Sequence, residues 1–562
     1  MIMSVNSLQY SLPSSIQRIF DENAAAWQQN NGTSRIWAKD ATLWTGSDEA
    51  KWLGWLDIAE RIAADAARYA ALRADVESSG FTDVLLMGMG GSSLCPEVLG
   101  VTFGKTRFHI LDSTSPAQIK AVEDRLDPAK TLFIVASKSG STLEPNCFKQ
   151  YFFDRVSTIV GKENAGRQFV AVTDPGSSME KAAKADGFRH IFYGDPEIGG
   201  RFSALSAFGM TAAAAMGIDV AKFLSNTAPM TAACRAESLA ENPGALLGVI
   251  LGTCHILGRD KLTFFPSPEI YDLGAWLEQL IAESTGKRGV AIIPVDREPG
   301  QKEYGSDRVF AFISVNNDDA IKAQFTAVTA AGHPAVLIDM DDISTLGQEF
   351  FRWEFATATA GSLMKINTFD QPDVEAAKVE ARKLTDEYEK EGKLPDETPF
   401  FESEGVKMFA SKEYGGELAA AVTEPTLASL VAAHIDKIGA NDYFALLAFI
   451  EMNASHEAIL QAIRQKVLRE TRAATCLGFG PRFLHSTGQA YKGGPNTGVF
   501  LQITADDPID LTVPGQKYTF GVVRAAQARG DLQVLIDRGR RALRIHLGKD
   551  VSGGLRKIES II

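Results

Sequence analysis

The stretch TLFIVASKSGST, residues 131–142, joins a continuous apolar run to a loop of hydroxyl side chains with one lysine and one glycine. A short apolar run bounded by turn residues is typical of a strand buried on both faces of a parallel sheet. The same pattern occurs upstream, where VLLM at 84–87 precedes GMGGSS at 88–93. We therefore expect two strand–loop–helix units with related loops.

Similar runs continue along the chain in three blocks, each run followed by a helix-compatible stretch. This alternation predicts an α/β fold with parallel sheets flanked by helices. We expect an N-terminal helical arm over 1–50, a first domain over 51–240, a second domain over 241–391, and an insertion with a C-terminal α/β segment over 392–562. The last segment is expected to complete the second domain, although the pattern alone leaves open whether it stands apart.

The composition excludes several classes of function. The chain has 562 residues, 45% of them hydrophobic and 23% charged, with a formal net charge of −13 at pH 7. These values are typical of a globular protein. The negative net charge and the lack of a dense basic block argue against a nucleic-acid partner. The first residues lack a secretory signal, and no stretch predicts a membrane span.

Cysteine and histidine usage gives a second set of expectations. The five cysteines are scattered and odd in number, without a CxxC pair, and the eight histidines show no HxH or HExxH spacing. Such usage is typical of a reducing compartment and of a chain without structural zinc. We expect a cytoplasmic protein with neither a metal nor another cofactor.

The two loops have the composition of a phosphate-binding site. Backbone at Gly91 can approach an oxyanion and Ser92 can donate a hydroxyl, at a place where helix N-termini expose unpaired N–H groups. The candidate donors of the second loop are Ser137, Lys138, Ser139 and Thr142. Turn chemistry with Ser or Thr capping would place the same residue types in either loop alone. The prediction therefore depends on finding two such loops in adjacent units.

A dinucleotide site is an alternative for the first loop. GMGGSS partly imitates G-x-G-x-x-G, and Asp112 lies at the end of the following strand. Ser93 stands where the third glycine is required, however, and a nicotinamide cofactor would leave SKSGST without a role. The phosphate interpretation is therefore preferred.

Three charged side chains are candidates for chemistry. Glu283 lies at the flank of the apolar stripe of a predicted helix in YDLGAWLEQLIAEST, in a last turn where the helix dipole disfavours a negative charge. Arg201 follows two glycines and precedes an apolar helix, and Lys378 lies on a helix predicted to start near Pro372. Each would ordinarily be a solvated surface group, so local pattern alone assigns none of the three to a catalytic role.

Five motifs in order resemble those of the phosphoglucose isomerase (glucose-6-phosphate isomerase) family. They are MGMGGSSLCPEVL, SKSGSTLE, GGRFSALSAFG, LIAESTGK and NTFDQPDVEAAK. RIWAKDATLW at 35–44 and GFGPRFLHSTGQAYKGGPNTGVFLQIT at 478–504 resemble the bacterial branch commonly fused to transaldolase. The resemblance covers most of the chain and implies two sugar-isomerase (SIS) sandwich domains.

The resemblance implies isomerisation of a phosphosugar through a cis-enediolate. It places the base at Glu283, the enediolate-stabilising arginine at Arg201 and ring opening at Lys378. It places phosphate and sugar binding at Gly91, Ser92, Ser137, Lys138, Ser139, Thr142 and Gln371. Two alternatives stay open, which are a mannose/glucose 6-phosphate isomerase of dual specificity and a non-catalytic sugar-phosphate sensor.

The ring-opening histidine departs from the family order. In the common form it precedes the FDQ segment, but here His485 in FLHSTGQ follows it, while His333 in AAGHPAV lies in the expected interval. The apolar surroundings of His333 indicate a structural residue, so His485 is preferred. Because family active sites take this histidine from a partner subunit, the resemblance also implies a homodimer with shared sites.

Overall fold

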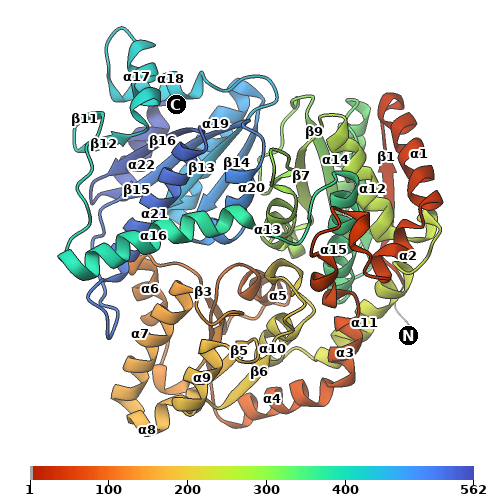
Figure 1. The fold of residues 1–562 in the computed structure, drawn as a ribbon, viewed down its shortest axis with the longest axis horizontal. Helices are drawn as coiled ribbons and strands as arrows, with labels where there is room; N and C mark the ends of the chain where they lie inside the picture. The colour runs from red at the N-terminus through yellow and green to blue at the C-terminus, as the bar shows by residue number, and fades with distance from the viewer. Residues whose placement is uncertain (1–3) are drawn as a thin grey trace.

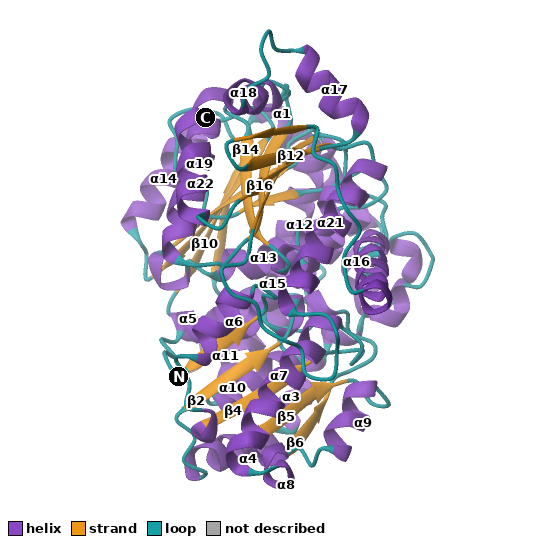
Figure 2. Cartoon of the chain, turned by 90° about the vertical axis from the view of Figure 1, so that its left-hand side faces the viewer, coloured by secondary structure: helices purple, strands orange, loops and turns teal. Residues whose placement is uncertain are grey.

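The computed structural model describes residues 4–562, apart from the side chain of Val374. Three separate sheets organise the chain, and each is flanked by helices (Figure 1). We call each sheet with its helices the N-terminal, middle or C-terminal unit. Figure 2 shows the N-terminal sheet at one end of the molecule and strands of the other two sheets at the opposite end. Among the described residues, no helix is both long and apolar enough to span a membrane.

The N-terminal sheet is fully parallel, in the order β3-β2-β4-β5-β6. Its strands are β2 (Asp83–Met87), β3 (Phe108–Leu111), β4 (Thr131–Ala136), β5 (Phe169–Thr173) and β6 (His190–Tyr193). Its helices are α3 (Ile58–Ala64), α4 (Ala66–Ser78), α5 (Leu94–Thr102), α6 (Pro116–Glu123), α7 (Leu143–Val160), α8 (Lys162–Ala165), α9 (Ser178–Ala185), α10 (Ala207–Ala215) and α11 (Val220–Ala233). Every residue of β2, β4 and β5 is buried, as the continuous apolar runs predict for strands covered on both faces.

The middle sheet has the order β1-β10-β9-β7-β8. Its strands are β1 (Ser7–Ser11), β7 (Lys261–Pro266), β8 (Ile293–Val295), β9 (Arg308–Val315) and β10 (Ala335–Met340). Its helices are α1 (Ser14–Gln29), α2 (Gly32–Trp37), α12 (Pro243–Ile256), α13 (Leu273–Thr285), α14 (Asp319–Ala330) and α15 (Leu346–Leu363). Within the expected N-terminal arm, β1 pairs antiparallel with β10 and so adds an edge strand to this sheet.

The C-terminal sheet has the order β11-β12-β16-β15-β13-β14. Its strands are β11 (Phe401–Ser403), β12 (Val406–Phe409), β13 (Tyr443–Phe449), β14 (Ala474–Phe479), β15 (Gly498–Ala505) and β16 (Arg541–Leu547). Its helices are α16 (Pro372–Glu391), α17 (Lys412–Ala420), α18 (Leu427–Ile435), α19 (Ala454–Thr471), α20 (Gly488–Gly493), α21 (Phe520–Asp537) and α22 (Val551–Ile561).

Residues 392–562 thus do not complete the second domain by extending its sheet. Their strands pair only with one another among the described residues, and the unit has an apolar core of its own around β13, β15 and β16. The unit also begins before residue 392, since α16 packs along α21, where a Cβ on Gly530 would lie 2.9 Å from the amide nitrogen of Ala381. A second apolar cluster joins the C-terminal unit to α13 and β8.

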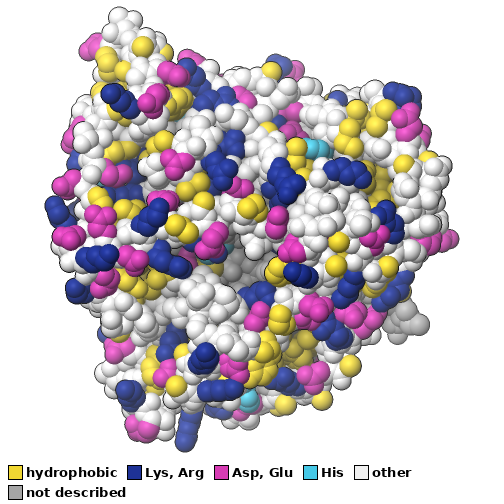
Figure 3. Space-filling model, viewed as in Figure 1, with side chains coloured by type: hydrophobic (Ala, Val, Ile, Leu, Met, Phe, Trp, Pro, Cys, Tyr) yellow, Lys and Arg dark blue, Asp and Glu magenta, His cyan; other side chains and the backbone are white. Residues whose placement is uncertain are grey.

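Short 3-10 turns link the three units at their centre. η4 (Gly90–Ser92) and η7 (Gly200–Phe202) of the N-terminal unit contact α13 of the middle unit, and η11 (Arg482–His485) of the C-terminal unit contacts η4. The face in Figure 3 is hollowed near this junction, and its acidic and basic side chains are interspersed. The junction is where the predicted site residues gather.

Candidate active site

The two candidate loops meet at one point of the N-terminal sheet. β2 leads to β3 on one side, and β4 pairs with its other side, so the strand order reverses between β2 and β4. Ligands of open α/β sheets bind at such a reversal, outside the carboxyl ends of the strands. GMGGSS follows β2 and SKSGST follows β4, so the fold brings both loops to that point.

Close packing requires glycine in the first loop. A Cβ at Gly91 would lie 1.9 Å from the carbonyl oxygen of Gly200, the residue before Arg201. Gly90 has a φ of +55°, and a Cβ there would lie 2.8 Å from the carbonyl oxygen of His485. The loop therefore fixes the segments that carry Arg201 and His485 against each other, with Ser92 half-buried beside them.

The SKSGST loop presents hydroxyls at the start of a helix. Thr142 is the N-cap of α7 and its side chain makes no capping hydrogen bond, while the hydroxyls of Ser139 and Ser141 lie 2.9 Å apart. Ser137 is buried, and its hydroxyl has no hydrogen-bond partner among the described residues. Lys138 is already engaged, because its Nζ contacts the carboxylate of Asp174 and the carbonyl oxygen of Asp195. Hydroxyls and helix N–H groups are therefore the available anion donors.

Arg201 and Glu283 form a buried ion pair across two units. Nη1 of Arg201 lies 3.3 Å from Oε1 of Glu283, which is in the last turn of α13. Four further acceptors orient the guanidinium: the Ser284 hydroxyl at 2.7 Å, Gln371 Oε1 at 3.0 Å, and the carbonyl oxygens of Thr368 and Asp370 at 2.7 and 2.9 Å. Burial lowers the pKa of Arg201 from its ordinary value, against the opposing effect of Glu283.

The structure brings His485 to the same place within one chain. Gln279, one turn before Glu283, donates to Glu283 Oε2 at 3.0 Å and to the carbonyl oxygen of His485 at 2.9 Å. Nε2 of His485 lies 2.9 Å from Oε1 of Glu144, which also accepts a hydrogen bond from Gln527. Although burial acts to raise it, the charges of His485 and Lys378 hold the pKa of Glu144 below its ordinary value.

Sequence reasoning missed Gln279 and Glu144 as site residues. Both had a usable signal, since Gln279 lies four residues before Glu283 on the same helix and Glu144 lies two residues after Thr142. Residues four apart share a helix face. Their shared partner His485 comes from another unit, however, and no local pattern predicts that.

The FDQ segment closes another side of the site. Gln371 binds Arg201, and Nζ of Lys378 lies 3.8 Å from Glu375 with its side chain 41% exposed. Lys287, which sequence reasoning also missed, is buried beside this segment with its Nζ 2.7 Å from Oδ1 of Asp370. Burial, together with the charge of Arg201, lowers the pKa of Lys287 to about 7.

His333 lies elsewhere. It precedes β10 at the amino end of that strand, and its ring packs against Phe310 at 5.4 Å and Tyr304 at 6.1 Å between centroids. Burial and the nearby Arg259 and Arg308 lower its pKa. The environment is that of a packed ring, remote from the loops after β2 and β4.

The gathered groups can carry out proton transfer next to a bound anion. A fixed carboxylate can accept a proton, a fixed guanidinium can stabilise an oxyanion that forms beside it, and a carboxylate-held imidazole can act as an acid or base. The hydroxyl loop at the start of α7 can bind a phosphate group nearby. This combination fits an intramolecular proton shift on a phosphorylated substrate.

Several proteins of known name are similar to this chain in sequence. The sequence model of the phosphoglucose isomerase family matches residues 73–309. A glucose-6-phosphate isomerase of Parasynechococcus marenigrum is 32% identical over 54% of this chain and 63% of its own length. One from a Synechococcus species is 30% identical over 54% of this chain and 67% of its own length, and a probable one from Methanococcus maripaludis is 28% identical over 54% and 78%. The chain thus spans less than two thirds of the first of these relatives.

Solved structures share the fold. A hypothetical protein of Thermus thermophilus is 26% identical, with a TM-score of 0.55 over 67% of this chain and 99% of that one. A glucose-6-phosphate isomerase of Chlamydia trachomatis, 22% identical, has a TM-score of 0.50 over 63% of this chain and 77% of that one, and it supports the fold alone. With the matched family model and the 30% identical relative, these findings show that the chain belongs to the phosphoglucose isomerase family.

Proposed function

We propose that the chain interconverts glucose 6-phosphate and fructose 6-phosphate through a cis-enediolate. The observation that carries the proposal is the buried pair of Arg201 and Glu283, 3.3 Å apart, beside the loops at the sheet reversal. The names of the relatives from Parasynechococcus marenigrum and a Synechococcus species support the same reaction. A sensor without turnover would not need a fixed carboxylate next to a fixed cation.

Glu283 is proposed to be the base of the reaction. Its carboxylate removes the proton from C2 of the open aldose and returns it to C1, while the C2 hydroxyl loses its proton and the C1 oxygen gains one, so that the C1 carbonyl becomes a hydroxyl and C2 becomes the carbonyl. Arg201 stabilises the negative charge on the enediolate oxygen, and its guanidinium is held by neighbours before the substrate arrives. Gln279 orients the carboxylate of Glu283.

His485 and Lys378 are proposed to open the sugar ring. Ring opening needs a proton on the ring oxygen and the loss of one from the C1 hydroxyl. Glu144 holds the imidazole of His485 through Nε2, and the charge of Lys378 acts to lower the pKa of Glu144. Gln371 is proposed to contact the sugar while it binds Arg201.

The 6-phosphate is proposed to bind the loop from Ser137 to Thr142 with Gly91 and Ser92 opposite. Ser139 and Thr142 hydroxyls and the N-terminal amides of α7 would be the donors. Lys138 lines this loop, but its ion pair with Asp174 makes it a supporting charge rather than the main anchor.

The site is proposed to be complete within each chain. A homodimer with shared sites was expected because relatives take the histidine from a partner, yet His485 of the same chain contacts Glu144 and neighbours Gln279 here. The motifs of residues 35–44 and 478–504 support a place in the branch commonly fused to transaldolase. Five free cysteines, all buried, support a cytoplasmic location.

A coupled assay tests the proposed reaction. We expect fructose 6-phosphate to yield glucose 6-phosphate, measured by a dehydrogenase specific for that product, with mannose 6-phosphate followed in parallel. Equal formation of both aldoses would favour dual specificity. Tight binding of fructose 6-phosphate without any product would favour a sensor.

A further inference from the structure

The turn η11 carries two polar side chains toward the N-terminal unit. Arg482 and His485 are its first and last residues, three positions apart. Side chains at i and i+3 of a 3-10 helix lie on the same side, because the helix has three residues per turn. The two residues between them, Phe483 and Leu484, are buried in the apolar cluster that joins the C-terminal unit to α13 and β8. One side of the turn is therefore anchored in that cluster, while the other side faces the N-terminal unit.

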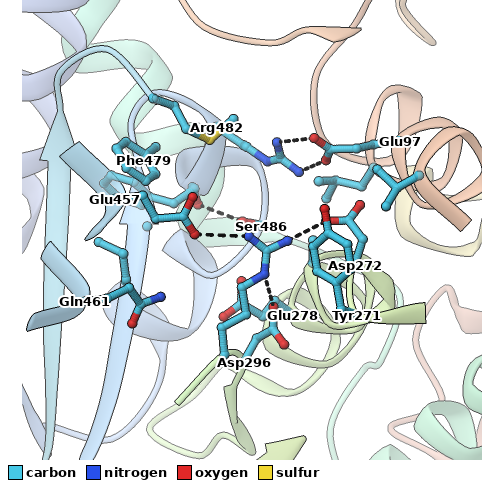
Figure 4. Close-up of a pocket in the computed structure, with 18 of the residues that line it drawn as sticks. Glu97, Tyr271, Asp272, Glu278, Asp296, Glu457, Gln461, Phe479, Arg482 and Ser486 are labelled. Carbon is cyan, nitrogen blue, oxygen red and sulfur yellow. Dashed lines mark hydrogen bonds and ion pairs between the residues drawn. The ribbon is translucent and has the colours of Figure 1, made fainter. Parts of the chain in front are cut away.

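Arg482 binds two carboxylates of the N-terminal unit. Its Nη1 donates to Oε1 of Glu97 at 3.0 Å, and its Nη2 contacts the other oxygen of the same carboxylate. Figure 4 shows this guanidinium directed at Glu97 on α5, beside a cavity that both residues line. Its Nε lies 3.5 Å from Oδ2 of Asp112, the residue after β3. A planar guanidinium that is held on three of its nitrogen atoms has a fixed orientation.

These ion pairs are largely withdrawn from water. The side chains of Arg482, Glu97 and Asp112 are 15%, 18% and 3% exposed. Burial raises the pKa of Asp112 to about 6, so its carboxylate is still largely ionised at neutral pH. Separating the groups would leave a buried charge without a partner, which is costly in free energy. The contact of η11 with the N-terminal unit is thus set by charge as well as by packing.

Asp112 also connects Arg482 with the first candidate loop. The hydroxyl of Ser93, the N-cap of α5 directly after η4, donates to Oδ2 of Asp112 at 3.4 Å. Asp112, the acidic residue that a dinucleotide site would require, is therefore engaged with groups of the protein itself. At the other end of η11, the carbonyl oxygen of His485 lies against Gly90 of η4. The turn is thus held on the N-terminal unit at both ends.

We propose that Arg482 is a positioning residue for opening of the sugar ring, because its ion pairs with Glu97 and Asp112 dock η11 and so hold His485 at Glu144. The inference rests on the proposed isomerisation, in which His485 acts on the cyclic sugar. Arg482 itself acts through the histidine, since its guanidinium is fully engaged with the two carboxylates.

The positioning role should matter for cyclic substrate far more than for open-chain substrate. Proton transfer between C1 and C2 depends on Glu283 and Arg201, whose contacts include Gln279 and Ser284 of α13. None of these contacts involves Arg482. Loss of the arginine should therefore impair ring opening and leave the later proton transfer nearly intact.

An open-chain substrate separates the two steps. 5-Deoxyfructose 6-phosphate lacks the C5 hydroxyl that closes the furanose ring, and its C6 oxygen carries the phosphate, so it stays open. NMR measures deuterium uptake at C1 from D₂O with this compound and with fructose 6-phosphate. In Arg482→Gln, uptake by fructose 6-phosphate should be about 10- to 100-fold slower than in wild type, as for a displaced catalytic group, whereas uptake by the 5-deoxy compound should change little.

Two further variants control the comparison. Arg469→Gln removes an exposed arginine on α19 of the same unit and should leave both rates unchanged. Glu97→Gln weakens the same ion pair from the other side, so it should also slow the cyclic substrate selectively. Melting temperatures verify that each variant is folded. Should Arg482→Gln fail to fold, Glu97→Gln provides the same test.

Unchanged rates with both substrates, or equal losses with both, in the folded Arg482→Gln and Glu97→Gln proteins would overturn the positioning role. Wild type that exchanges hydrogen with neither substrate would instead refute the proposed isomerisation. The position of His485 is then tested without turnover, through its modification by diethyl pyrocarbonate followed by peptide mass spectrometry. Its side chain is 11% exposed, and it should react several times faster in Arg482→Gln than in Arg469→Gln. Equal rates of modification would mean that Arg482 does not hold the histidine.

Discussion

Glu283 receives a hydrogen bond on one carboxylate oxygen from Gln279 and faces the Arg201 guanidinium with the other. A carboxylate fixed in this way is positioned to carry a proton between adjacent carbons. Glu283→Gln keeps the shape of the side chain but cannot accept the proton, so kcat should fall by about 10³-fold or more, near the upper range of acid–base catalysis. Steady-state kinetics with fructose 6-phosphate measure this.

Solvent isotope exchange, together with ligand binding, distinguishes the loss of the catalytic base from the loss of the folded structure. Deuterium incorporation at C1 and C2 should vanish in Glu283→Gln together with turnover, while a sugar-phosphate hydroxamate should still bind through Arg201 and the hydroxyl loop. Exchange at the wild-type rate in the folded variant would mean that another residue is the base.

The two histidines give a comparative prediction. His485→Ala removes the imidazole that Glu144 holds, so turnover of cyclic substrate should fall by about 10²- to 10⁴-fold. His333→Ala removes a ring packed against Phe310 and Tyr304, and should lower the melting temperature with little change in kcat. A larger catalytic loss in a folded His333→Ala protein would reverse the assignment.

At the scale of single residues, the sequence predicted those site candidates that both their chemistry and a family motif indicated. Arg201, Glu283 and His485 lie together, with Gln371 on the guanidinium of Arg201. The sequence could not reveal Glu144, whose role depends on a histidine 341 residues away along the chain, or the burial of Lys287 beside Asp370. Contacts of that sequence separation are set by packing of whole units, which no local pattern contains.

At the scale of elements, the strand order places the loop after β4 at the reversal of the sheet, and helix α7 begins directly after this loop. The hydroxyl of Thr142, the N-cap of α7, makes no capping bond there, and that of Ser139 lies at the surface. Replacing Ser139 and Thr142 together by Ala should raise KM more than it lowers kcat, because the phosphate stays bound throughout the reaction. Thr158→Ala, an exposed hydroxyl later on α7, serves as the matched control. An unchanged KM in the folded double variant would remove the loop from the site.

Element prediction worked best where apolar runs were continuous. The runs at 84–87 and 131–136 became buried parallel strands at the expected places. The sequence did not reveal that the strands between residues 401 and 547 form a sheet of their own, because parallel strands of any block look alike and a strand's own residues do not identify its partner. For the same reason the sequence did not predict β1 as a strand of the middle sheet, since its pairing with β10 joins residues more than 300 positions apart.

At the scale of the whole molecule, the candidate site lies where the three units meet. The N-terminal unit contributes Arg201 and Glu144, the middle unit contributes Glu283, and the C-terminal unit contributes His485. η4 and η11 are in contact, and the glycines of η4 allow no side chain between them. A separate C-terminal sheet therefore explains how a histidine late in the chain reaches a site built by earlier residues.

This arrangement predicts the result of mixing two inactive variants. If each chain completes its own site, a mixture of Glu283→Gln and His485→Ala proteins, unfolded and refolded together or co-expressed, should stay as inactive as the separate variants. If a partner subunit supplied the histidine, hybrid dimers would pair a wild-type Glu283 with a wild-type His485 and recover up to about one quarter of the wild-type activity, as expected for random pairing of subunits with closed symmetry. Size-exclusion chromatography of the mixture establishes whether hybrids can form, and recovery of activity would show that the sites are shared. Dilution adds an independent measure, because a site completed in one chain keeps its specific activity at concentrations where any dimer dissociates.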